Sequence, residues 1–257
     1  MIKWCCYCQQ FIREISPFED FGITHGVCIK CEDAHDNLFA EDVVARGEFL
    51  RKIFQRLFDA GRRDNVPLAI AAIDEAVAAN CRPVDILMGM VAPMLYEIGE
   101  EWERSALSVE GEHRFTAFCE KVIDLVALRV HASDRASPSS LPLLFLMNAP
   151  GNMHLLALRI LALWLGGLGA VVRIVDQAID TDDLLQLISA ERPKYLLISM
   201  SLLEQREAVI AIAAAAQTLP EHSRPRTVVG GYPVKVGLIR SIPTAELIPD
   251  ISELRLN

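Results

Sequence analysis

Two pairs of cysteines near the start of the chain have the spacing of a metal site. Cys5 and Cys8 form one C-x2-C pair, and Cys28 and Cys31 form a second pair after nineteen intervening residues. Four thiolates bind a zinc ion tetrahedrally, and a metal allows a segment with too few apolar residues for a core to fold. We therefore predict one zinc ion at these four residues. The alternatives are Cys6 in place of Cys5, His25 or His35 in place of a thiolate, an iron–sulfur cluster, a redox dithiol, and free thiols in a loop.

A second set of reactive side chains lies in the middle of the chain. Glu112 and His113 follow Trp102 by ten and eleven residues, and His154 comes forty-one residues after His113. An indole can lie flat against a large planar group, a carboxylate accepts hydrogen bonds, and an imidazole binds metals. Without context, Trp102 would be read as a core aromatic and Glu112–His113 as a solvated pair. Their interpretation therefore depends on the elements that position them.

Trp102 and His113 lie in a segment with a helical pattern, from about 41 to 132. Apolar residues recur on one face at helical spacing, namely Leu50, Ile53, Phe54, Leu57 and Phe58. Pro67 and Pro83 suit first helical turns, and Ser108 is the predicted N-cap of a last helix that ends near residue 131. The pattern predicts a bundle of four antiparallel helices.

His154 lies at the start of a segment with a different pattern. Short apolar runs alternate with helical stretches: the runs are 143–147, 170–175, 195–199, 227–229 and, less clearly, 246–248, and the stretches are 153–167, 181–190 and 203–217. Alternating strands and helices predict a doubly wound parallel sheet, which binds ligands at the carboxyl ends of its strands.

Small and polar residues recur at these predicted strand ends. Asn152, Met153 and His154 follow the first strand, whereas Ser199 and Ser201 end the third, and Gly230-Gly231 follow the fourth. Each feature alone indicates no more than ordinary turn chemistry, and His154 alone could be a polar helix cap. Their order along the chain is what favours a ligand site.

These motifs together resemble those of cobalamin-binding proteins, over about residues 46–250. Trp102 followed by Glu112-His113 resembles the helical cap of adenosylcobalamin-dependent photoreceptors that regulate transcription. Asn152-x-His154-x-x-Ala157 resembles the D-x-H-x-x-G motif of the Rossmann-like, flavodoxin-like domain that follows the cap. Asn152 stands where an acid usually orients the histidine, and Ala157 stands where glycine usually allows close approach of the nucleotide tail.

The resemblance implies roles for these residues around an adenosylcobalamin or another cobalamin. His154 would bind cobalt from below, and Trp102 would lie over the upper face. Glu112 would accept hydrogen bonds from sugar hydroxyls, and His113 would move onto cobalt after light releases the adenosyl group. The residues expected beside the lower face and the nucleotide tail are Asn152, Met153, Ala157, Ser199, Ser201, Gly230 and Gly231.

The function implied is a light sensor or signalling protein rather than an enzyme. The helix-turn-helix domain of the photoreceptors is not seen, so we expect output through a protein partner, such as a transcription regulator or a sensory protein. One alternative is a corrinoid carrier for methyl transfer, which would be an enzyme component. The other is a haem-binding sensor on the same fold, with His154 as the axial ligand.

Composition and charge argue against a nucleic-acid-binding, membrane or secreted protein. The chain has 257 residues, 52% hydrophobic and 23% charged, and its net charge of −9 argues against direct nucleic-acid binding. No membrane span or signal peptide is expected, and paired cysteines fit a reducing compartment, so we predict a cytoplasmic protein. A homo-oligomer is left open. The expected parts, each with its own core, are a cysteine module (1–40), a helical cap (41–133), a linker (134–141) and a cobalamin domain (142–257).

Overall fold

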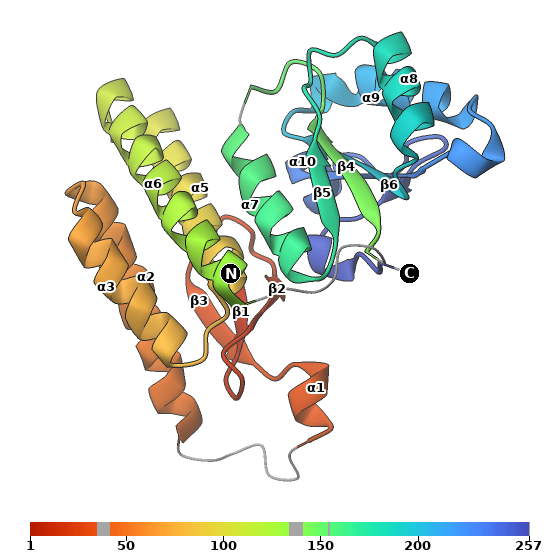
Figure 1. The fold of residues 1–257 in the computed structure, drawn as a ribbon. Helices are drawn as coiled ribbons and strands as arrows, with labels where there is room; N and C mark the ends of the chain where they lie inside the picture. Colours follow the sequence, from red (N-terminus) through yellow and green to blue (C-terminus); the bar gives the residue numbers. More distant parts are fainter. Residues whose placement is uncertain (35–41, 134–140, 154, 257) are drawn as a thin grey trace. The chain divides into compact units, whose positions relative to one another are not determined.

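The computed structural model describes residues 1–34, 42–133, 141–153 and 155–256. The chain divides into two compact units, Met1–Arg135 and Ala136–Asn257. The first unit combines a small sheet with helices, and the second has a parallel sheet with helices on both faces (Figure 1). The predicted fold class, a helical domain followed by a doubly wound α/β domain, is confirmed. The predicted linker, 134–141, lies outside the described residues except for Leu141.

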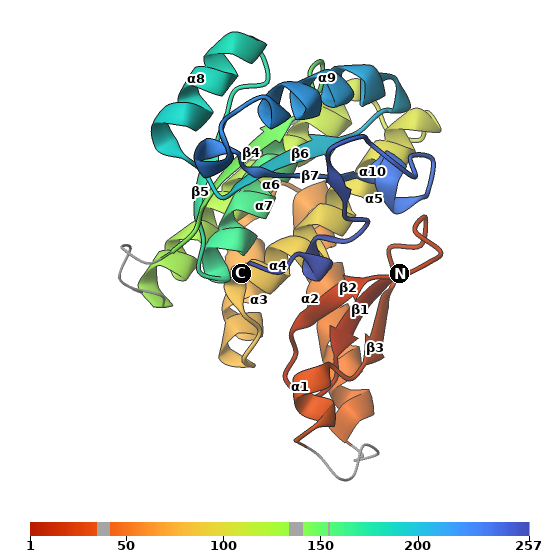
Figure 2. The same ribbon diagram turned by 90° about the vertical axis from the view of Figure 1, so that its right-hand side faces the viewer.

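The cysteine-rich segment forms a three-stranded sheet that the sequence did not predict. Its strands are β1 (Ile2–Cys5), β2 (Phe11–Glu14) and β3 (Ile23–Gly26), in the order β2-β1-β3, and a one-turn helix α1 (Ile29–Glu32) follows. β1 runs antiparallel to β2 and parallel to β3. Figure 2 shows this sheet beside α2.

The expectation that the cysteine-rich segment has a core of its own is wrong. Trp4 of β1 is completely buried, and its indole packs against Gly89 of the helical part. Residues 1–34 are also part of the same compact unit as the helices. The physical reason is size. A sheet with four-residue strands is too small to bury an indole by itself, so the indole must pack against a neighbouring element.

The helical part has the four predicted helical regions. These are α2 (Asp42–Arg62), α3 (Val66–Ala78), the segment from Pro83 to Glu103, and α6 (Val109–Ser133). Pro67 lies in the first turn of α3, where the Asn65 side chain accepts a hydrogen bond from the Leu68 amide at 3.0 Å. Ser108 Oγ accepts a hydrogen bond from the Gly111 amide at 3.1 Å, as expected of an N-cap.

The third helical region is interrupted. A short helix, α4 (Pro83–Ile86), passes into a π-helical turn, η1 (Leu87–Val91), and then into α5 (Ala92–Glu103). All five residues of η1 are buried. A π-helical turn is wider than an α-helical turn and is rare. Its presence here indicates that a side chain from another element packs against this part of the helix.

The second unit has a five-stranded sheet in which all strands are parallel. Its strands are β4 (Leu143–Asn148), β5 (Val171–Ile174), β6 (Tyr195–Met200), β7 (Arg226–Gly231) and β8 (Glu246–Leu247), in the order β5-β4-β6-β7-β8. The helices are α7 (Leu155–Gly167), α8 (Thr181–Glu191), α9 (Arg206–Gln217) and α10 (Tyr232–Lys235).

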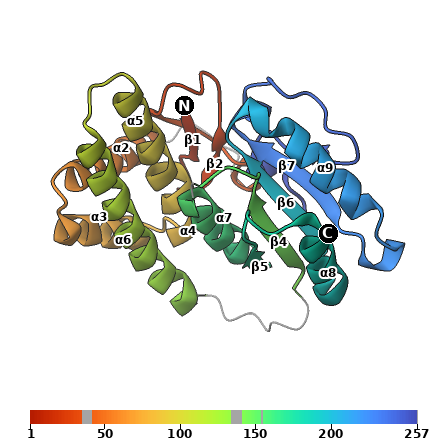
Figure 3. The ribbon, with the colours of Figure 1, turned by 90° about the horizontal axis from the view of Figure 1, so that it is seen from above.

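The strand order reverses direction between β4 and β6, because β5 lies on the other side of β4. Figure 3 shows α7 on one face of the sheet and α8 and α9 on the other. In such a sheet the loops after the two central strands diverge and leave a crevice for a ligand. None of the described helices is long and apolar enough to cross a membrane.

Candidate functional site

The four predicted cysteines come together in the first unit. The Sγ atoms of Cys5, Cys8, Cys28 and Cys31 all lie within 4.8 Å of one another. Cys8 Sγ and Cys28 Sγ are 3.8 Å apart, and all four thiols are free. The end of β1 and the turn after it supply Cys5 and Cys8, and the N-cap and third residue of α1 supply Cys28 and Cys31. Such a group of thiols offers the ligand set of a structural zinc site.

The surroundings of these thiols make Cys5 easier to ionise and make Cys8 and Cys31 harder to ionise. Burial opposes ionisation of Cys5, but the backbone N–H groups of Cys8, Cys28 and Tyr7 outweigh it and lower the pKa of the Cys5 thiol to about 7. Burial raises the pKa of the Cys31 thiol to about 11, and burial also raises that of Cys8. A metal ion would supply the positive charge that allows the remaining thiols to ionise.

Two of the alternative ligands, Cys6 and His25, are not part of this group. Cys6 is buried in the same turn, but its thiol is not among the four that converge. His25 lies on β3 against Gly47 of α2, where burial and then the Arg51 charge lower the pKa of its imidazole. His35 lies outside the described residues. Cys81 and Cys119 are buried in the helical part and lie apart from the four thiols.

Trp102, Glu112 and His113 lie on either side of the connection between α5 and α6. Trp102 is in the last turn of α5 and 48% exposed, so it is not a core residue of the bundle. Glu112 and His113 are in the first turn of α6, with His113 Nε2 3.6 Å from Glu112 Oε2. The Glu112 carboxylate also accepts a hydrogen bond from Thr116 Oγ1 at 2.7 Å, whereas the His113 side chain is 73% exposed.

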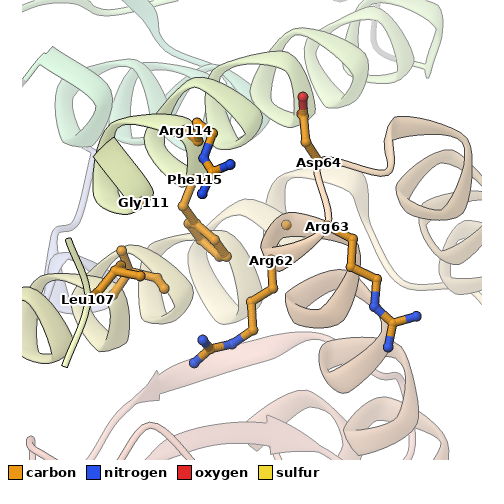
Figure 4. A pocket seen from close by; sticks show the side chains of 9 residues that line it. Arg62, Arg63, Asp64, Leu107, Gly111, Arg114 and Phe115 are labelled. Atoms are coloured by element: carbon orange, nitrogen blue, oxygen red, sulfur yellow. The ribbon is translucent and has the colours of Figure 1, made fainter. Parts of the chain in front are cut away.

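A small cavity of about 190 Å³ lies beside the first turn of α6, between the end of α2 and the start of α6. Figure 4 shows Phe115 and Arg114 of α6 and Arg62 of α2 around it. Arg62 also lies over the Phe58 ring and forms an ion pair with Glu101. The cavity is smaller than the ~300 Å³ at which ligand pockets begin, so it is too small for a corrin.

A larger groove of about 520 Å³ lies between the turn at residues 19–22 and α5. Three glutamates of α5 line it, Glu97, Glu100 and Glu101, together with Arg104. Burial raises the pKa of the Glu97 carboxyl, and the neighbouring Glu101 charge raises it further. This groove is therefore unsuited to an anionic ligand.

Polar and small residues meet at the carboxyl edge of the parallel sheet in the second unit. Ser199 at the end of β6 pairs in register with Asn148 of β4 on one side and Gly230 of β7 on the other. Asn148 is fully buried, and its Nδ2 donates to the backbone oxygen of Asn152 at 3.0 Å. Asn152 Nδ2 in turn donates to Ser201 Oγ at 2.7 Å. Two predicted residues, Asn152 and Ser201, thus share one hydrogen-bonded network with Asn148, and the strand ends that carry Ser199 and Gly230 lie beside it.

The other predicted residues of this edge are less tied to one another. Met153 is 76% exposed, and its sulfur accepts a hydrogen bond from Gln177 Nε2 at 2.8 Å. Ala157 is exposed in the first turn of α7. Gly231 has a φ of +105°, and a Cβ there would overlap the Met200 carbonyl, so a structural need accounts for this glycine. His154 lies outside the described residues.

Large apolar side chains are exposed next to the same strand ends. Met153 and Leu155 follow β4, Leu202 and Leu203 follow β6, and Tyr232 follows β7. Exposed fractions range from 43% for Tyr232 to 76% for Met153. An edge with buried polar groups and exposed apolar ones is suited to a ligand that is large and partly apolar.

Asn148 and Gln205 are site residues that sequence reasoning missed. Gln205 is buried, and its Oε1 accepts hydrogen bonds from the backbone amides of Ser201 and Leu202, at 2.9 and 3.1 Å. It fixes the loop that carries Ser201. A polar residue that ends an apolar run could have indicated Asn148, whereas nothing local marks Gln205, which acts through the fold of a loop.

Comparison with known protein families finds one match within the first unit. Residues 53–126 match a family model described as the B12 binding domain. The matched range extends from α2 into α6 and includes Trp102, Glu112 and His113. A search of curated proteins finds no match to this chain. The family match supports cobalamin binding by the chain.

Solved structures with a similar fold include corrinoid proteins. The monomethylamine corrinoid protein of Methanosarcina barkeri matches with a TM-score of 0.62 and 16% identity, over 77% of this chain and 92% of that one. A cobalamin-binding protein from Desulfitobacterium hafniense DCB-2 has a TM-score of 0.40, with 11% identity over 78% and 94% of the two chains. The methanol:cobalamin methyltransferase complex of M. barkeri has a TM-score of 0.35, with 13% identity over 84% and 80%.

The first of these similarities is a likeness of fold, and the other two are too weak to carry an argument. The chain therefore has the combined helical and α/β fold of a corrinoid protein.

Proposed function

We propose that this chain binds a cobalamin and presents it to a partner protein. The observation that carries the proposal is the carboxyl edge of the parallel sheet, where the buried Asn148–Asn152–Ser201 network lies beside exposed apolar side chains. The edge adjoins a strand-order reversal, which is where open α/β sheets bind ligands. The B12 binding domain match in the helical unit supports the same conclusion.

In this proposal His154 would hold the cobalt of the cofactor, and Asn152 would orient its imidazole. An amide oxygen, like the acid usual at this position, accepts an imidazole N–H. Ser201 fixes the Asn152 side chain through the hydrogen bond at 2.7 Å. Met153, Ala157, Ser199, Gly230 and Gly231 would border the lower face and the nucleotide tail.

Within the corrinoid class, we propose a carrier in methyl transfer, with a methyltransferase as the partner. A bound cobalamin supplies a cobalt that accepts and donates a methyl group. Similarity of fold to the monomethylamine corrinoid protein supports this proposal. The chain's own residues would bind and orient the corrin, and the exposed Trp102 and His113 would be open to a partner or an upper ligand.

Reconstitution of the full chain with hydroxo-, methyl- and adenosylcobalamin tests this proposal. A carrier should retain methylcobalamin through desalting at least as well as adenosylcobalamin. His154→Ala should change the visible spectrum, and His222→Ala, an exposed histidine of the same unit, should not. Failure to retain any cobalamin would overturn the proposal, and a Soret band with haem would favour the haem sensor.

A light sensor is the second candidate, and Trp102 favours it. Its indole is half-exposed at the end of α5, the helix that precedes the α6 start with Glu112 and His113, and an exposed indole is what holding an adenosyl group requires. In that case the chain should prefer adenosylcobalamin in the dark, and green light should change its spectrum. His113→Ala should alter that photoproduct, whereas His222→Ala should not. An unchanged spectrum under light would eliminate the sensor and leave the carrier intact.

We also propose that Cys5, Cys8, Cys28 and Cys31 hold one zinc ion. Their convergence within 4.8 Å supports it. Elemental analysis of protein purified under reducing conditions should give one zinc per chain, and Cys8→Ser should lower it while the neighbouring Cys6→Ser should not. Iron, or no metal at all, in the parent protein would contradict the zinc assignment.

A further inference from the structure

The four-thiol turn touches the helical part of the first unit directly. Gln9, one residue after Cys8, is buried and has a φ of +56°. Its Oε1 accepts a hydrogen bond from Cys81 Sγ at 3.4 Å, just before α4 begins. The backbone conformation of the metal-binding turn therefore determines what the start of α4 contacts.

Trp4 provides a second contact, immediately before Cys5. Its indole is fully buried and lies against Gly89, in the middle of the π-helical turn η1. A Cβ at Gly89 would overlap the Trp4 ring, so the two residues fit only because position 89 is glycine. A rare helical geometry thus coincides with the place where an indole from another element inserts.

Asp85 of α4 provides a third contact. It is fully buried and accepts two hydrogen bonds from Arg82, both 2.7 Å, and a further one from the Phe11 backbone amide. Phe11 begins β2, directly after the turn that carries Cys8. A buried carboxylate is costly unless its hydrogen bonds are made, so the position of β2 affects the stability of α4.

These three contacts all reach residues 81–89. This segment continues through the π-helical turn η1 directly into α5, which carries Trp102. We infer that the metal at the four thiols holds the α4–η1–α5 segment in place. The local stability of α5, the helix that carries Trp102, then depends on whether the metal is bound. The inference rests on the proposed zinc centre. The zinc would join the end of β1 and its following turn to the start of α1, and its removal would release Gln9 and Trp4 from the helical segment.

Hydrogen exchange of the full chain without cobalamin tests the inference. Amides of residues 81–103 should exchange roughly tenfold faster or more after zinc is removed with a chelator under reducing conditions, and Zn²⁺ alone should restore protection. Strands β4–β7 of the second unit should keep their protection, because they belong to a separate compact unit.

Gly89→Ala separates the contact from the metal. This variant should still bind one zinc per chain, yet residues 81–103 should exchange fast whether or not zinc is present. Gly99→Ala is the matched control, since Gly99 lies in α5 with nothing within 4 Å of an added Cβ, and it should behave like the parent.

The outcomes distinguish the two proposals. If the parent chain binds no zinc, the zinc centre fails and the coupling fails with it. If zinc binds but its removal leaves exchange at 81–103 unchanged, the zinc centre stands and the coupling is wrong. Zinc-dependent protection in the parent, lost in Gly89→Ala and kept in Gly99→Ala, supports the coupling.

Discussion

Trp102 is a large apolar side chain that the helical unit leaves 48% exposed. Trp102→Ala should therefore change the free energy of unfolding by no more than about 0.5 kcal/mol. The same substitution should weaken adenosylcobalamin by about 1–3 kcal/mol, as usual for an aromatic side chain buried by a ligand. Hydroxocobalamin should be affected less, because its small upper ligand does not reach an aromatic plate. Titration followed by visible absorption measures both affinities.

Tyr96→Ala is the control for this prediction. Tyr96 is a second half-exposed aromatic of α5, but it stacks on Phe21 with ring centroids 6.1 Å apart. Its loss should lower stability and leave cobalamin affinity close to that of the parent. Equal losses of both cobalamins in Trp102→Ala would show that the indole does not contact the upper ligand.

Glu97 should make the first unit less stable at neutral pH than at acid pH. Burial and the Glu101 charge raise the pKa of Glu97 in the folded state. A raised carboxyl pKa stabilises the fold below the unfolded-state pKa, ~4.3, and this contribution is lost as pH rises through the folded pKa. Glu97→Gln should thus unfold at higher urea than the parent at pH 7, and the difference should shrink toward pH 4. A difference that is constant with pH would mean that ionisation of Glu97 does not destabilise the first unit.

β7 ends in a glycine that its neighbouring strand requires. Gly231 has a positive φ, and a Cβ there would overlap the Met200 backbone of β6. Gly231→Ala should destabilise the second unit by about 1–3 kcal/mol, the usual cost of such strain. Gly166→Ala in α7 is the matched control, because its Cβ would meet nothing within 4 Å and alanine favours a helix. Urea unfolding followed by circular dichroism would compare them, and equal stability of the two variants would contradict the packing argument.

The elements that the sequence predicted are those with a strong local pattern. Helical spacing from Leu50 to Phe58 and the short apolar runs at 143–147 and 195–199 correspond to α2, β4 and β6. The small sheet and η1 were not predicted, because their cause is not local. Trp4 inserts at Gly89, 85 residues away, and no periodicity in either segment reports such a contact.

In the candidate site, too, local patterns could be predicted and long-range contacts could not. Residue types at strand ends indicated Asn152, Ser199 and Ser201, and the structure connects Asn152 to Ser201. Asn148 and Gln205 were missed because their roles depend on hydrogen bonds to a loop backbone. The four cysteines were predicted by spacing alone, since a tetrahedral metal dictates that spacing in sequence.

The whole chain carries a net charge of −9, which bears on how either proposed function would reach its target. Nucleic-acid binding without sequence preference depends on lysine and arginine neutralising phosphates, which an acidic chain opposes. A cobalamin that binds or leaves cannot change this balance enough to create a basic surface. We therefore expect output through a protein partner in either candidate function.

Fluorescence anisotropy with a labelled random duplex tests this expectation. The chain should not bind the duplex at physiological salt, whether free, loaded with adenosylcobalamin in the dark, or illuminated. Lowering the salt should produce little binding. An acidic protein neutralises few phosphates and therefore displaces few counterions from the DNA. Tight binding that falls steeply with salt would reveal a basic surface that the net charge conceals, and direct DNA regulation would then replace the partner as the route of output.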